Sequence, residues 1–260
     1  MTFDPATPSH LAGGVLRRSA GPPVAVTDPA TLETVGYRAE TTEAEREAAL
    51  DAVTAAQRGW AALDAKSRAA ALHAVAARIE AADHAAIGAL MTREVGKPYP
   101  ESVGELANCA SVFRYFAEMA RDEAGKVAGS VQAGSFQYAR YEPLGVSVHI
   151  MPFNFPILLM CWTVSASLAA GNGCVIKPAE ATTLTTLAFM DVFADLPAGL
   201  VACLPGGAGL GRALVESPRT HAVAFTGSVA AARAVGAAAG AALKPAVIEG
   251  GGSDALIVSE

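Results

Sequence analysis

The chain has 260 residues, which is enough for one large α/β domain or for one and a half domains. Its formal net charge of −6 argues against nucleic-acid binding, and no uninterrupted apolar stretch is long enough to span a membrane. Hydrophobic residues, most of them Ala and Val, make up 52% of the sequence, and charged residues only 17%. This balance indicates a domain that buries extra surface against a partner or a further domain.

The cysteines and the N-terminus indicate a cytoplasmic protein. The four cysteines are widely spaced in apolar contexts and form neither a CxxC pair nor a ligand cluster with histidine: Cys109, Cys161, Cys174 and Cys203. We expect buried free thiols, as in a reducing compartment, and no bound metal. The segment after Met1 has no basic region followed by an apolar core, so no signal peptide is expected.

The first half of the chain predicts an arm followed by helices. Residues 1–25 are rich in Gly and Pro and predict a loose arm. Thr42 and Glu45 form a capping-box pattern that begins a helix, and further helices are predicted at about 67–80, 83–94 and 101–121. Gly96-Lys97-Pro98 ends the third of them. Residues 26–124 are therefore predicted to form a helical region.

The second half predicts a hairpin and then alternating strands and helices. Aromatic residues among glycines at 125–142 indicate an antiparallel hairpin. Strands are predicted at 145–151, 173–177, 200–204, 221–225, 245–249 and 255–258, with helices at 156–170, 183–194, 208–216 and 229–242. Repeated strand–helix–strand units imply right-handed crossovers and a parallel sheet. The predicted class is α/β, with a Rossmann-like parallel sheet over residues 143–260, flanking helices, the N-terminal helical region and the inserted hairpin.

Two strand-to-helix junctions could bind a phosphate. Gly206 and Gly211 lie in a Gly-rich turn, and Thr226-Gly227-Ser228 follows the apolar run that ends at Phe225. Helix N-termini carry free N–H groups and a partial positive charge, which suits a dinucleotide. The first junction could equally be a simple connection, and Ser228 could be only an N-cap.

Charged and polar residues follow other predicted strands. Lys177-Pro178 ends a strand and forces an extended exit, so Lys177 and Glu180 lie at the rim of the sheet and could grip the two hydroxyls of a ribose, or could be a solvated ion pair. Asn154 could donate to a developing oxyanion or could cap a turn. Glu249, at the end of an apolar strand, could be a buried general base or a turn residue.

In their order and spacing these segments resemble the aldehyde dehydrogenase superfamily. The resemblance runs from about Val26 to Glu260 and includes Glu94-Val95-Gly96-Lys97-Pro98, Tyr141-Glu142-Pro143-Leu144-Gly145, Met151-Pro152-Phe153-Asn154-Phe155-Pro156, Lys177-Pro178-Ala179-Glu180, Phe225-Thr226-Gly227-Ser228 and Ile248-Glu249-Gly250-Gly251-Gly252. It implies oxidation of an aldehyde to a carboxylic acid with NAD, with NADP as the alternative cofactor.

The resemblance assigns roles to individual residues. It implies that Asn154 forms the oxyanion hole and that Glu249 activates the deacylating water, which favours the hydrolytic branch of the family. It also implies a set of cofactor-binding residues: Pro152, Phe153, Lys177, Pro178, Glu180, Gly206, Gly211, Phe225, Thr226, Gly227, Ser228, Glu249 and Gly250. The negative charge of Glu180 should repel the extra phosphate of NADP, so NAD is expected to be preferred.

The sequence also departs from the family pattern. Gly250 and Ser253 replace the usual leucine and lysine, Phe153 replaces a common tryptophan, and no cysteine lies at the nucleophile position. We therefore expect this chain to be the cofactor-binding half of such an enzyme, without the catalytic domain that holds the aldehyde. Alone, the chain is expected to be inactive toward aldehydes. A non-catalytic nucleotide-binding fragment and a subunit of a split enzyme remain open. The 125–142 hairpin resembles the family's oligomerisation element, which implies a homo-oligomer or association with a complementary chain.

Overall fold

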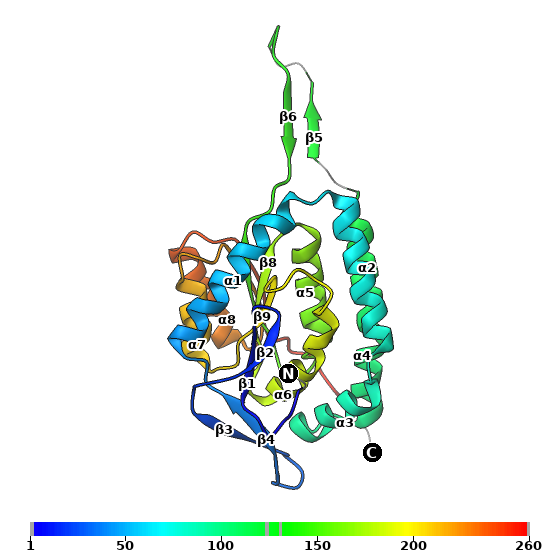
Figure 1. Cartoon of the computed structure of the whole chain (residues 1–260), viewed down its shortest axis with the longest axis vertical. Coiled ribbons are helices and arrows are strands. Elements are labelled where there is room, and N and C mark those ends of the chain that lie inside the picture. The colour runs from blue at the N-terminus through cyan, green and yellow to red at the C-terminus, as the bar shows by residue number, and fades with distance from the viewer. Residues whose placement is uncertain (1–2, 123–124, 130–131, 259–260) are drawn as a thin grey trace.

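A seven-stranded sheet forms the centre of the computed structural model, which describes residues 3–122, 125–129 and 132–258 (Figure 1). The strand order is β11-β10-β7-β8-β9-β1-β2. The parallel part consists of β7 (Val146–Ile150), β8 (Gly173–Lys177), β9 (Val201–Cys203), β10 (Ala222–Thr226) and β11 (Ala246–Glu249). The predicted α/β class and these five strands are confirmed.

The crossover connections add successive strands first on one side of β7 and then on the other, so the strand order reverses at β7. The chain passes from β7 through α5 (Leu158–Ala169) to β8, and through α6 (Thr183–Phe189) and the 3₁₀ helix η2 (Met190–Phe193) to β9. It then returns through α7 (Ala208–Glu216) to place β10 on the other side of β7, and α8 (Val229–Ala241) leads to β11. Open α/β sheets bind ligands where the strand order reverses, which here is at the carboxyl ends of β7 and β10.

Two hydrophobic cores cover the two faces of the sheet. Alternate strand residues such as Val148, Val175 and Ala202 pack with Leu50 of α1 (Glu43–Ala62) and with Leu214 of α7. The opposite face packs against α5 and, beyond it, against α2 (Ala65–Ala81), α3 (His84–Val95) and α4 (Tyr99–Met119). The period-two alternation of a strand explains why one short strand serves both cores.

The four predicted N-terminal helices are confirmed, and side-chain caps fix their starts. Thr42 and Glu45 form the predicted capping box of α1, while Asp64 and Asp83 cap α2 and α3. Gly96 ends α3 in the left-handed region, with φ 78°. This conformation favours glycine and directs the chain into α4 after a single tight turn.

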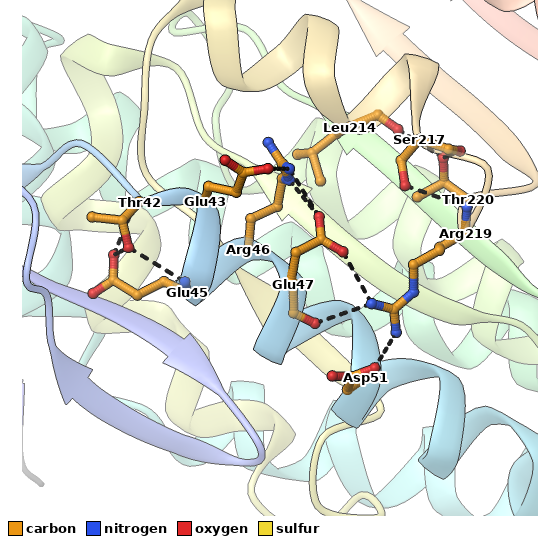
Figure 2. A network of polar contacts seen from close by, with 10 residues as sticks. All are labelled: Thr42, Glu43, Glu45, Arg46, Glu47, Asp51, Leu214, Ser217, Arg219 and Thr220. Atoms are coloured by element: carbon orange, nitrogen blue, oxygen red, sulfur yellow. Dashed lines mark hydrogen bonds and ion pairs between the residues drawn. The ribbon is translucent and has the colours of Figure 1, made fainter.

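A network of ion pairs holds α1 against the loop after α7 (Figure 2). The Arg219 guanidinium donates to the Glu47 carboxylate at 3.1 Å and also binds Asp51. Arg46 donates to the other Glu47 oxygen at 2.9 Å, and the Thr220 hydroxyl closes the loop by donating to the carbonyl of Leu214 at 2.7 Å. The network fixes the loop that leads into β10.

The prediction of a loose arm at residues 1–25 is wrong. This segment forms β1 (Ser9–Ala12), β2 (Val15–Arg18) and β3 (Pro23–Thr27), and β1 is buried beside β9. Gly13 and Gly14 have φ of 62° and 76°, so they form the two-residue turn of the β1–β2 hairpin. Strand β3 pairs with β4 (Thr34–Ala39), which the sequence reasoning also missed.

The predicted hairpin is confirmed, and it projects away from the sheet and helices (Figure 1). Its strands are β5 (Gly125–Ala128) and β6 (Gln137–Arg140), both fully exposed; residues 130 and 131 of the predicted 125–142 segment lie outside the described residues. No helix within the described ranges combines the length and apolar character needed to cross a lipid bilayer.

The predicted strand at 255–258 is wrong. The described residues after β11 pair with no strand, and Leu256, Ile257 and Val258 are 90%, 89% and 84% exposed. β-branched composition favours a strand only where a neighbouring strand supplies hydrogen-bonding partners and packing. The apolar pattern there was therefore insufficient evidence.

Candidate functional site

Lys177 and Glu180 lie at the carboxyl end of β8, as predicted. Lys177 is buried, and its Nζ donates to the carbonyl of Pro178 at 3.0 Å. Burial lowers the pKa of Lys177, whereas Glu180 and Glu40 act in the opposite direction. Glu180 begins the 3₁₀ helix η1 (Glu180–Thr182), and its side chain is half exposed. Lys177 is therefore not half of a solvated pair, and the carboxylate of Glu180 remains open to a ligand.

Arg38 and Glu40 were missed by the sequence reasoning and lie beside this pair. The Arg38 guanidinium contacts the Glu40 carboxylate and lies 3.4 Å from Oε2 of Glu180. Burial alone would raise the pKa of Glu40, but hydrogen bonds from Arg38 and from the backbone of Gly207 lower it. Arg38 lies near the end of β4 and Glu40 directly follows that strand, which the sequence reasoning did not recognise. The sequence pattern that could have predicted β4 is the alternation of the apolar residues Val35, Tyr37 and Ala39 with other residues.

The Gly-rich turn at 205–211 packs closely against these charged side chains. A Cβ on Gly206 would lie 2.7 Å from Leu210 Cδ2, and one on Gly207 would lie 3.1 Å from Glu180 Oε1. At Gly211 a Cβ would meet Cδ of Lys177 at 3.4 Å. The turn thus leaves room for Glu180 and Lys177 at the rim, where larger residues would displace them.

The Phe225-Thr226-Gly227-Ser228 junction connects β10 to α8. Phe225 is buried, and its ring lies so close to Gly227 that a Cβ there would approach Cζ to 2.7 Å. The Ser228 hydroxyl accepts a hydrogen bond from the N–H of Ala231 at 3.3 Å, so Ser228 is the N-cap of α8. Gly227 N–H donates to the carbonyl of Glu249 at 3.1 Å, which joins this junction to the end of β11.

Glu249 lies beside this junction but is exposed. It pairs in register with Thr226, and β11 is the edge strand of the sheet. The expectation that Glu249 is buried is therefore wrong for the described chain, because its apolar neighbours Ala246 and Val247 are exposed as well. Gly250 is exposed next to it, and a Cβ added there would lie 3.9 Å from Val229 and Ala232 of α8.

The Asn154 loop follows β7, between the loops that follow β10 and β8. Pro152 is buried, whereas Phe153 and Asn154 are exposed. The carbonyl of Asn154 accepts a hydrogen bond of 3.0 Å from Nζ of Lys97, which leaves the Asn154 side chain at the surface. Because β10, β7 and β8 are parallel neighbours, Ser228, Asn154 and Lys177 all lie at the carboxyl ends of adjacent strands, on the same side of the sheet.

Internal carboxylates occupy three of the four crossover helix N-termini. Glu105 accepts from the N–H groups that begin α5, and Glu94 accepts from those of Leu184 and Thr185 in α6, both at 2.7 Å. Glu40 accepts from Gly207 N–H at the start of α7, at 3.0 Å. Among the described residues, α8 alone of these four has no carboxylate at its N-terminus. Of these four helices, α8 therefore offers the N-terminal backbone N–H groups that are open to an anionic ligand.

The four cysteines are free and buried, as predicted. Burial raises the pKa of Cys161, Cys174 and Cys203, that of Cys174 to about 12. A thiol with a raised pKa and no access to solvent is a poor nucleophile. None of these cysteines lies on the loops that carry Asn154, Ser228 or Glu249.

Comparison with known proteins agrees with this geometry. The aldehyde dehydrogenase family model matches residues 16–260. The chain is 36% identical to a betaine aldehyde dehydrogenase of Cereibacter sphaeroides over 99% of its own length and 53% of that protein. The chain therefore belongs to the aldehyde dehydrogenase family and spans about half the length of the curated relative it matches.

Solved structures show the same likeness. A lactaldehyde dehydrogenase structure superposes with a TM-score of 0.91 at 30% identity, covering 96% of this chain and 53% of that one. A betaine aldehyde dehydrogenase variant from Staphylococcus aureus, in complex with NAD⁺, superposes with a TM-score of 0.89 at 25% identity, covering 96% and 52%. The predicted family and the Rossmann-like fold are confirmed.

Proposed function

We propose that this chain is the nucleotide-binding part of an NAD(P)-dependent aldehyde dehydrogenase that oxidises an aldehyde to a carboxylic acid. The observation that carries the proposal is the meeting of three loops at the β7/β10 switch point, with Asn154, Ser228 and Lys177 on neighbouring strand ends. Family membership supports the same class of reaction.

The residues at this edge fit a dinucleotide. The half-exposed carboxylate of Glu180 can accept hydrogen bonds from ribose hydroxyls, and Lys177 Nζ lies behind it as a buried cation. The pyrophosphate would lie at the N-terminus of α8, because internal carboxylates occupy those of α5, α6 and α7. Gly227 gives the backbone close access there, since Phe225 fills the space that a side chain would need.

The bound nucleotide would accept the hydride of the aldehyde. The Asn154 side-chain amide, exposed at the end of β7, would donate a hydrogen bond to the oxyanion that forms on the substrate. Glu249, exposed one strand beyond Ser228, would take a proton from the deacylating water. The thiolate would come from outside these residues, because all four cysteines of the chain are buried.

The charges around Glu180 favour NAD over NADP. Arg38 is a potential phosphate-binding cation, but it contacts both Glu40 and Glu180. With buried Lys177 included, the charges of this cluster balance, so the repulsion of an additional ribose phosphate would come from the half-exposed Glu180 carboxylate, which is open to a ligand. NADP binding would require Arg38 to leave one of these carboxylates.

A second candidate function is nucleotide binding without catalysis, either by this chain alone or as one subunit of a split enzyme. The burial of every cysteine favours it for the isolated chain. The exposed hairpin, with Val127, Phe136 and Tyr138 at 73%, 76% and 66% exposure, supports an oligomer or a complementary chain that covers it.

Calorimetric titration of the full chain with NAD, NADP and ATP tests the proposal. We expect saturable binding of NAD, weaker binding of NADP, and little heat with ATP. If neither dinucleotide gives heat or a thermal shift, the nucleotide assignment is wrong for this chain. Incubation with NAD and a panel of aldehydes then separates binding from catalysis.

A further inference from the structure

We propose that Lys97 and Glu105 are positioning residues that fix the Asn154 loop in the geometry needed for oxyanion binding. Lys97 lies in the single tight turn between α3 and α4, and Glu105 lies on α4. The inference rests on the proposed function, in which Asn154 is the oxyanion donor, and it concerns how the loop that carries that residue is held.

The Glu105 carboxylate uses one oxygen to bind the start of α5 and the other to bind Lys97. Oε1 accepts from the N–H of Ile157 at 2.8 Å and from that of Leu158 at 2.9 Å, and Oε2 accepts from Lys97 Nζ at 2.7 Å. Its side chain has no exposed surface. The carboxylate therefore anchors the C-terminal side of the loop, where α5 begins.

Lys97 holds the other side of the same loop. Its Nζ donates to the carbonyl of Asn154 at 3.0 Å and lies 3.6 Å from the centre of the Phe155 ring. The side chain is only 7% exposed. One ion pair thus binds four of the five positions of the segment 154–158, while Asn154 itself stays exposed.

General stabilisation does not account well for this arrangement. A buried ion pair loses so much hydration that apolar residues of the same volume often give equal or greater stability. Here each charged group is directed at the backbone of one loop, and the ring of Phe155 is a cation–π partner. What the pair contributes beyond apolar packing is a fixed backbone path, and with it the direction of the Asn154 side chain.

The test is NMR on the ¹⁵N-labelled full chain. The variants are Lys97→Met, Glu105→Gln and their combination, with Lys97→Arg as the conservative change. The controls are Lys66→Met and Glu101→Gln, which remove charges from exposed positions on α2 and α4. The double variant leaves no unpaired buried charge, so it remains informative if either single variant fails to fold.

We expect amide exchange at Ile157 and Leu158 to accelerate at least about tenfold in the double variant. The Asn154 side-chain amide signal should broaden or shift, while amides of β8 and α8 keep their wild-type exchange. Lys97→Arg should largely restore both readouts, because it keeps the cation.

Unchanged exchange and an unchanged Asn154 signal in the double variant would overturn the proposal, as would faster exchange spread evenly over the whole domain. Failure of Lys97→Arg to restore the loop would also count against it. These readouts need no nucleotide. A wild-type chain that fails to bind NAD would therefore overturn the proposed function and leave this test in force.

Discussion

The Glu40 carboxylate accepts a 3.0 Å hydrogen bond from the backbone N–H of Gly207 and so occupies the N-terminal end of α7. The same carboxylate contacts Arg38, which in turn lies 3.4 Å from Glu180. One internal acid therefore removes a possible phosphate site and also balances Arg38, a cation close to the proposed ribose position. The nucleotide is left with α8 for its pyrophosphate and with Glu180 for its ribose.

Glu180→Gln should shift nucleotide preference toward NADP. The change removes one of the two carboxylates on Arg38 and lowers the repulsion of a 2′-phosphate. We expect the ratio of NAD to NADP affinity to fall about tenfold, or ~1.4 kcal/mol. Calorimetry with both nucleotides measures the ratio, and Glu216→Gln, at an exposed ion pair on α7, is the matched control. An unchanged ratio would refute the charge argument for NAD preference.

Gly227→Ala should destabilise the chain and weaken nucleotide binding together. The added Cβ would approach Cζ of buried Phe225 to 2.7 Å. Overpacking of this kind costs about 1–3 kcal/mol of the free energy of unfolding. Gly240→Ala in α8 is the control, since a Cβ there has open space and should stabilise the helix by up to about 1 kcal/mol. Denaturant titration of both variants measures the free energy of unfolding. Equal changes in Gly227→Ala and Gly240→Ala would contradict this account.

The contribution of Glu94 to stability should decrease as the pH rises. Burial raises its pKa from 4.5 to about 7, against the hydrogen bonds from Thr185 and Leu184. The folded chain therefore binds more protons than the unfolded chain between these two values. The resulting stabilisation is complete below about pH 4.5 and is lost as the pH rises through about 7, with a full span on the order of 3 kcal/mol.

Denaturant unfolding at pH 5 and pH 8 measures this effect. The difference in free energy of unfolding between wild type and Glu94→Gln should be smaller at pH 8 than at pH 5. Glu101→Gln, exposed on α4, should show no such dependence. A Glu94 contribution that grows with pH would mean that the hydrogen bonds, rather than burial, control its ionisation.

Much of the fold could be predicted from the sequence, because the elements behind the site carry strong local signals. Apolar runs marked β7 to β11, and the capping box marked the start of α1. The prediction of a loose arm at residues 1–25 failed because Gly13 and Gly14 form the turn of a hairpin whose strands are only four residues long. Such short strands are recognisable only through their pairing, of β1 with β9 and of β2 with β1.

The site was predictable only where its residues follow strands. Lys177, Asn154 and Ser228 lie at strand ends that the pattern located. Arg38 and Glu40 reach Glu180 and Gly207 across more than 140 residues of sequence, and no local pattern reports such a contact. The burial expected for Glu249 failed because its strand is an edge strand with exposed neighbours.

The isolated chain should not oxidise aldehydes, and its thiols should be unreactive. All four cysteines are buried, so a thiol reagent should label essentially none of them in the folded chain and all of them in denaturant. Incubation with NAD and several aldehydes should give no reduced nucleotide. Turnover that is lost in one Cys→Ser variant would show that a nucleophile is present in this chain after all.

The chain should self-associate unless a complementary surface is present. The hairpin exposes Val127, Phe136 and Tyr138, and Val247 on the edge strand β11 is 65% exposed. Exposed apolar strands of this kind pair readily with other chains. Sedimentation at several concentrations should show association that Val127→Lys with Tyr138→Lys reduces. A monodisperse wild-type monomer at every concentration would contradict this.

The central claim is that a dinucleotide binds with its pyrophosphate at the N-terminus of α8. Calorimetry of NAD binding to Ser228→Asp tests it most directly, because Asp is as good an N-cap as Ser but repels an anion. Ala208→Asp is the matched control at the start of α7, which Glu40 already occupies. We predict that Ser228→Asp lowers NAD affinity at least about tenfold, or ~1.4 kcal/mol, while Ala208→Asp leaves it near wild type. Equal losses in both variants, or no loss in Ser228→Asp, would contradict the assignment.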